Sequence, residues 1–137
     1  MNLPLLLDTN VCIWTVADVL PRAAQATLTE AFIAGRPTFV SPITALEIAT
    51  LIRKGRFKSK LPPQRWFERL MGQPGIELAP MPPEILIASQ LLPGDIHKDP
   101  ADRIIAATAR EYGYMVMTRD RQLLDYGRAG HLAVMPC

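Results

Sequence analysis

The sequence predicts an α/β fold, a three-layer α/β/α sandwich with a central, mostly parallel sheet of four or five strands. Short apolar runs alternate with segments of helical length along the chain, and strands that alternate with helices usually pair in parallel. The first run, over residues 5–7, is hydrophobic at every position, as a strand covered on both faces requires. Prolines and glycines mostly mark where the segments begin and end.

The same signals locate each element. The expected strands are residues 3–8, 37–41, 76–81 and 115–118, with 132–135 as the candidate fifth. The expected helices are a short one from about residue 11, then 21–33, 42–54, 63–71, 83–92, 100–112 and a short turn over 121–126. Ser41 and Asp99 are expected to cap the helices that begin with Pro42 and Pro100, and Gly113 to end the second of these.

The 137 residues are expected to form one domain, 1–137, large enough to bury a core without disulfides. Cys12 and Cys137 are the only cysteines and give no disulfide or zinc framework. No apolar run is long enough to span a bilayer, and the first residues lack the basic start and cleavage site of a signal peptide. We therefore expect a cytoplasmic protein without a membrane partner.

The net charge of +2 decides little, but the basic residues are unevenly distributed. Arg53, Lys54, Arg56 and Lys58 fall, together with Lys60, in a stretch that contains no acid. Such a stretch suits the phosphate backbone of a nucleic acid. A solvated helix end followed by a loop explains it equally well.

Acidic residues stand at two of the expected strand ends. Asp8 follows the first strand directly, and Asp120 comes just after residue 118. In parallel sheets ligands bind beyond the carboxyl ends of the strands. Turn or cap chemistry is the alternative for both residues. For Asp8 the two interpretations balance, whereas the helix-start pattern TRDRQLLDY favours the alternative for Asp120.

Glu47 stands in an expected helix, on one stripe with Ile43 and Leu51. A carboxylate on such an apolar stripe is costly unless it is paired or bound to a cation. An ion pair with Arg53 or Lys54 is the ordinary explanation. Their spacing of six and seven residues from Glu47 fits such a pair poorly, and this favours a functional role.

Asp102 would be the third residue of a helix capped by Asp99, and acids suit both positions. For Asp99, capping is the preferred interpretation. Asp102 differs because the alanine-rich run over 106–109 lets its helix lie close to the sheet. This would hold the start of the helix near Asp8 and Asp120.

Several carboxylates in one place would repel each other and raise each other's pKa values. A divalent cation would resolve this conflict, and a site made only of oxygen ligands fits Mg²⁺ or Mn²⁺ rather than zinc. Hydrolysis of phosphodiester bonds is a reaction that such clusters serve. The sequence therefore predicts a catalytic, metal-binding cluster of Asp8, Glu47, Asp102 and Asp120.

Four motifs stand in order along the chain: LLLDTNVCIW, SPITALEIATLIRKGRF, DPADRIIAATAREYGYMVMTRD and, overlapping its end, DRQLLDY. In this order they resemble the PIN-domain nucleases, and among them the VapC-type toxins of bacterial toxin–antitoxin pairs. The resemblance covers nearly the whole chain. It implies a compact α/β/α sandwich whose metal site is formed mainly by Asp8, Glu47 and Asp102.

The resemblance also extends to residues around the metal site. Thr118 and Asp120 match the threonine and the acid of a T-x-D motif. Asn10 stands where many relatives have His, so we expect it to influence the surroundings of the metal or the substrate. Asp99 belongs to an Asp-Pro-x-Asp form found in a subset of relatives. Besides capping the helix, it could therefore bind the metal directly or lie beside the metal ligands.

For function, the resemblance implies a toxic endoribonuclease that cuts structured RNA, often transfer or ribosomal RNA. It also implies a VapB-type antitoxin that blocks the site, and a homodimer. Trp14, Trp66 and Phe67 could line a groove for an antitoxin helix or simply belong to the core.

Three other functions fit the sequence less well. A phosphatase of the haloacid-dehalogenase type needs a second Asp two positions after the first, where this chain has Asn10. A response-regulator receiver domain needs an Asp after its third strand and a Lys after a later one, and neither is evident. A PIN module that binds RNA or an antitoxin without catalysis would have lost acids, whereas all four matched positions are acidic.

Overall fold

The computed structural model describes residues 2–96 and 98–137, and a five-stranded sheet forms its centre. The strands are β1 (Leu5–Leu7), β2 (Thr38–Val40), β3 (Ile76–Leu78), β4 (Met115–Thr118) and β5 (Val134–Pro136). They pair in the order β3-β2-β1-β4-β5, and each of these pairs is parallel. The predicted parallel sheet is confirmed, and the candidate fifth strand is present.

Helices fill the connections between the strands. They are α1 (Thr9–Val16), α2 (Arg22–Ile33), α3 (Ile43–Arg53), α4 (Pro63–Met71), α5 (Pro83–Ala88), α6 (Pro100–Tyr112) and α7 (Arg121–Arg128). α1 begins at Thr9, earlier than expected, because the Asp8 side chain already caps it. α5 ends at Ala88 rather than near residue 92, because Gln90 and Leu91 donate to carbonyl oxygens three residues back instead of four.

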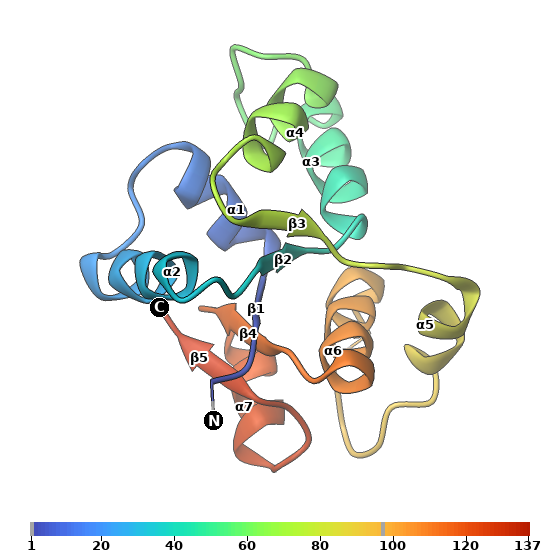
Figure 1. Cartoon of the computed structure of the whole chain (residues 1–137). Coiled ribbons are helices and arrows are strands. Elements are labelled where there is room, and N and C mark those ends of the chain that lie inside the picture. Colours follow the sequence, from blue (N-terminus) through green and yellow to red (C-terminus); the bar gives the residue numbers. More distant parts are fainter. Residues whose placement is uncertain (1, 97) are drawn as a thin grey trace.

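The side chains of the sheet point alternately into two hydrophobic cores, as the pleat of a strand requires. Leu6 and Val116 belong to the core that the sheet shares with α5, α6 and α7. Leu7 and Met117 belong to the core shared with α1, α2, α3 and α4. Figure 1 shows α2 and α6 on opposite sides of the sheet. The predicted α/β/α sandwich is therefore confirmed.

The strand order reverses beside β1. The chain proceeds from β1 to β2 and β3 on one side, then returns to place β4 against the other side of β1. In open parallel sheets the crevice at such a reversal, beyond the carboxyl ends of the strands, is the usual ligand site. Asp8 follows β1 and Thr118 ends β4, so both lie at this crevice.

Among the described residues, no helix is long and apolar enough to cross a membrane.

Candidate active site

Asp8 is fixed at the carboxyl end of β1 and is only 5% exposed. Its Oδ1 accepts a hydrogen bond from the backbone N–H of Thr9 at 2.8 Å, and its Oδ2 accepts one from the Thr118 hydroxyl at 2.7 Å. Burial raises the pKa of Asp8, while these two hydrogen bonds lower it. The Thr118 hydroxyl also accepts from the backbone N–H of Asp120 at 3.0 Å. One buried threonine thus joins the ends of β1 and β4.

Glu47 reaches the same region from α3. It accepts a hydrogen bond from the Thr9 hydroxyl, whose oxygen also lies 3.0 Å from the hydroxyl of Thr44. Because Thr9 has a single hydroxyl proton and donates it to Glu47, Thr44 must be the donor to Thr9. Burial raises the pKa of Glu47, the bond from Thr9 lowers it, and the charges of Asp8 and Asp99 raise it.

Asp102 and Asp99 stand at the start of α6. Asp99 is the N-cap, and its side chain accepts from the backbone N–H of Ala101 at 2.9 Å. The predicted cap is therefore present. Asp102 lies in the first turn and is 9% exposed, and residues 104–109 are buried throughout. The alanine-rich run thus lies in the core, as the sequence predicts, and the start of α6 approaches the strand ends.

Asp102 experiences the charge of the whole cluster. Burial, above all, and then four neighbouring carboxylates raise its pKa to about 8. These carboxylates belong to Asp8, Asp99, Asp120 and Glu47. These four acids, which together with Asp102 come from four parts of the chain, therefore lie close enough to interact electrostatically with Asp102. Such a concentration of negative charge attracts a cation.

Asp120 has the capping role that its sequence pattern favoured. It is the N-cap of α7, and its carboxylate accepts from the backbone N–H of Leu123 at 2.9 Å. Its charge nevertheless raises the pKa values of Asp8 and Asp102. The two interpretations of Asp120 are thus compatible, because a capping carboxylate here also borders the cluster.

The remaining predicted residues lie outside this network. Asn10 is exposed on α1, and the basic residues at the end of α3 and after it are exposed as well, namely Arg53, Lys54, Arg56 and Lys58. Among the described residues, Glu47 forms no ion pair with Arg53 or Lys54, and its partner is Thr9. Trp66 is 3% exposed and belongs to the core, which excludes it as an open groove residue.

Two site residues were missed by the sequence argument, Thr9 and Thr44. Both are buried, and together they hold Glu47. A signal existed, because Thr9 follows Asp8 directly and Thr44 lies one helical turn before Glu47. Threonine is too common at such places for this signal to stand alone.

The donor set fits a hard divalent cation. Within the described residues, no three acidic, His or Cys side chains already converge as a closed set of ligands. Mg²⁺ does not require one, because it is usually held by one or two carboxylates, several waters and the phosphates of the substrate. The carboxylate oxygens of Asp8 and Asp102, buried beside one another's charge, are donors of the kind that Mg²⁺ and Mn²⁺ prefer.

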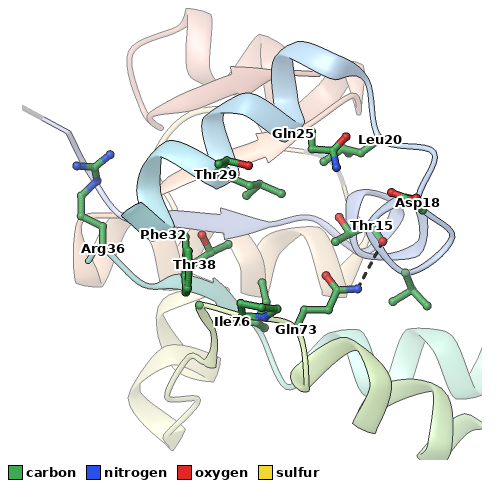
Figure 2. Close-up of a pocket in the computed structure, with 14 residues that line it drawn as sticks. Thr15, Asp18, Leu20, Gln25, Thr29, Phe32, Arg36, Thr38, Gln73 and Ile76 are labelled. Carbon is green, nitrogen blue, oxygen red and sulfur yellow. Dashed lines mark hydrogen bonds between the residues drawn. The ribbon is translucent and has the colours of Figure 1, made fainter. Parts of the chain in front are cut away.

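A cavity of about 510 Å³ lies elsewhere, between α2 and the starts of β2 and β3. Figure 2 shows Phe32 of α2 facing Thr38 and Ile76, with Arg36 at one end and Asp18 at the other. None of the predicted site acids lines it. This cavity is therefore separate from the carboxylates.

Known proteins resemble this chain in sequence and in fold. The family model described as the PIN domain matches residues 5–129. Ribonuclease VapC22 of Mycobacterium tuberculosis is 29% identical over 121 residues, which cover 88% of this chain and 90% of that protein.

Solved structures of toxin–antitoxin complexes share the fold. VapBC2 from Rickettsia felis, bound to a DNA fragment from its promoter, matches with a TM-score of 0.72 at 17% identity, covering 96% of this chain and 97% of that one. DNA-bound VapBC from Salmonella typhimurium matches with a TM-score of 0.65 at 21% identity, covering 98% of both chains. At these identities the likeness establishes the fold alone.

Proposed function

This chain belongs to the PIN-domain family, and from that premise we propose that it is a metal-dependent endoribonuclease, the toxin of a toxin–antitoxin pair. The observation that carries the proposal is the gathering of five carboxylates beyond the carboxyl ends of parallel strands. There burial, and then the charges of the other four acids, raise the pKa of Asp102 to about 8. The similarity to a protein named as a ribonuclease over 88% of the chain supports the same reaction.

We assign Asp8 and Asp102 as the principal ligands of Mg²⁺ or Mn²⁺. Glu47 is a further ligand or orients the attacking water, and Asp120 completes the site directly or through water. Asp99 caps α6 and adds negative charge beside Asp102. When bound, the metal supplies positive charge that stabilises the phosphorane-like transition state and favours ionisation of a water.

The protein's own contribution is to hold these oxygens in place. Thr118 binds Oδ2 of Asp8 and so limits rotation of that carboxylate. The Thr44–Thr9 pair binds Oε1 of Glu47, which leaves Oε2 to accept a proton or a hydrogen bond from water. Preorganised groups of this kind need little rearrangement during the reaction.

The substrate and partners follow from the same proposal. The substrate is structured RNA, with transfer and ribosomal RNA as the classes to test, and the exposed residues Arg53, Lys54, Arg56 and Lys58 suit its backbone. Asn10 is the exposed second residue of α1, and its role in the proposal is to influence the surroundings of the metal or the contacts with the substrate. The proposal further includes a VapB-type antitoxin that binds the protein and blocks its site. The protein forms a homodimer and acts in the cytoplasm.

The test compares purified wild type with Asp8→Asn and Asp102→Asn on cellular RNA. Wild type should cleave with Mg²⁺ or Mn²⁺ and stop when a chelator is added. Each variant should lose activity on the order of a hundredfold or more, because a neutral amide replaces a charged ligand. Asp125→Asn is the matched control, since Asp125 is an exposed carboxylate on α7 that pairs with Arg128 at 2.6 Å.

Two outcomes would contradict the proposal in different ways. If both cluster variants cleave as well as wild type, the assigned site is wrong. If wild type binds RNA but never cuts it with either metal, the chain is a binding module without catalysis.

A further inference from the structure

Arg119 stands between Thr118 and Asp120, two residues of the site, yet its side chain makes contacts of its own. The carbon of its guanidinium group lies 4.2 Å from the ring centroid of Trp14, and its Nε donates to the carbonyl oxygen of Cys137 at 2.9 Å. The guanidinium is thus stacked on an aromatic ring and fixed by one hydrogen bond. An exposed arginine held in this way is more ordered than surface arginines usually are.

Trp14 provides a firm support for this stacking. It is partly buried and packs against the core shared by the sheet and α1 to α4. Arg119 itself is exposed. Among the described residues, the only hydrogen bond from its side chain is the one that Nε donates, so the two Nη groups form none. The two Nη groups are therefore presented to solvent in a fixed orientation, and binding through them costs less side-chain entropy.

This guanidinium lies beside the carboxylate cluster rather than within it. Trp14 is six residues after Asp8 on α1, about 9 Å along the helix at about 1.5 Å per residue. Arg119 adjoins Thr118, which binds Asp8. Burial raises the pKa of the Cys137 thiol, the charge of Arg119 lowers it, and the charge of Asp8 raises it further. Arg119 and Asp8 therefore both lie near this thiol.

We propose that Arg119, supported by Trp14, binds a backbone phosphate of the RNA that flanks the phosphate to be cut. The inference rests on the proposed function and names a contact that holds its substrate. Guanidinium groups bind phosphates through paired N–H donors, and the Nη groups of Arg119 supply such donors. A strand that approaches the five carboxylates is repelled by them, so a cation at their border favours the productive position.

The test measures RNA binding without cleavage, in the Asp102→Asn background. The probe is an end-labelled RNA hairpin with a single-stranded loop of mixed sequence, and its binding is followed by fluorescence anisotropy at several salt concentrations. Arg119→Gln should weaken binding about fivefold at about 0.1 M salt and reduce the slope of log affinity against log salt by about 0.7, as loss of one phosphate contact requires. Arg22→Gln is the matched control, because Arg22 is an exposed arginine at the start of α2.

A second variant examines the role of the ring. Trp14→Leu should weaken RNA binding while its circular dichroism confirms a folded protein, because the charge of Arg119 remains but its support is lost. The double variant Trp14→Leu/Arg119→Gln should bind no more weakly than Arg119→Gln alone, since both changes remove one contact. Additive losses would mean that Trp14 acts independently of Arg119.

The proposal is overturned if Arg119→Gln and Arg22→Gln have the same affinity and the same salt slope. If the single variant Arg119→Gln, in which Asp102 is intact, still cleaves RNA in that case, the proposed function stands without this contact. If wild type neither binds nor cleaves RNA, the proposed function fails and the inference fails with it.

Discussion

Asp8 and Asp102 are both buried, but the protein stabilises their charges to different extents. Asp8 accepts hydrogen bonds from the Thr9 backbone and the Thr118 hydroxyl, which favour its ionised form. Burial and the surrounding acids raise the pKa of Asp102 to about 8. In the absence of a cation, Asp102 is therefore the carboxylate whose ionisation most opposes folding.

This difference predicts how stability depends on pH. The ordinary pKa of Asp102 is 3.8 and its folded value is about 8, so between these values the folded chain retains a proton that the unfolded chain has lost. Stability should therefore fall as pH rises through this window. Asp102→Asn, which cannot ionise, should be more stable than wild type by at least about 1 kcal/mol at the upper end, and the gain should shrink toward pH 4.

Urea unfolding of both proteins in the presence of a chelator measures this effect. Parallel profiles of unfolding free energy against pH for wild type and Asp102→Asn would contradict the raised pKa. Asp125→Asn serves again as the control, because its carboxylate is exposed and lies outside the cluster.

Residue patterns predicted which acids come together better than how each acid is held. Glu47 was recognised because it shares a stripe with Ile43 and Leu51, and it does lie in the cluster. Its partner Thr9 is 38 positions away in the sequence. That contact depends on how α1 packs against α3, which no local pattern encodes.

At the scale of elements, proline and glycine signals predicted the helices well where a proline marks the start and a glycine marks the end. α4 and α6 have the expected bounds, and Gly113 ends α6 with a left-handed φ of 74°. α5 was predicted too long because its stop signal, Pro93-Gly94, lies several residues beyond the last α-helical hydrogen bond, in which an N–H donates to the carbonyl oxygen four residues earlier. A stop signal limits a helix without requiring it to continue that far.

Two substitutions distinguish the capping role of Asp99 from its role as a negative charge beside the site. Asp99→Asn keeps an oxygen acceptor for the Ala101 N–H and removes the charge, whereas Asp99→Ala removes both. We expect the free energy of unfolding of Asp99→Asn to lie within a few tenths of a kcal/mol of the wild-type value, and this variant to keep most of its cleavage activity. The free energy of unfolding of Asp99→Ala should be lower by about 1 kcal/mol. Thermal unfolding and the RNA cleavage assay measure the two effects. If Asp99→Asn is as inactive as Asp102→Asn, Asp99 is a metal ligand rather than a cap alone.

At the scale of the whole molecule, the alternation of strands and helices predicted the layers and the parallel sheet, but not the strand order. The bond between Asp8 and Thr118 joins residues 110 positions apart, and it exists because β4 lies beside β1. The sequence placed both residues at strand ends. Only the return of the chain across β1 brings those ends together.

The same topology predicts that a cation stabilises the entire fold. The acids come from the end of β1, from α3, from the start of α6 and from the start of α7, so an ion bound among them links segments far apart in the chain. At about 100 times its dissociation constant, Mg²⁺ should raise the unfolding free energy of wild type by about 2.7 kcal/mol. Asp8→Asn and Asp102→Asn should gain much less, and Asp125→Asn should gain as much as wild type. Amide exchange should slow together in β1, β4 and the first turn of α6. An equal gain in all four proteins would mean that Mg²⁺ binds elsewhere.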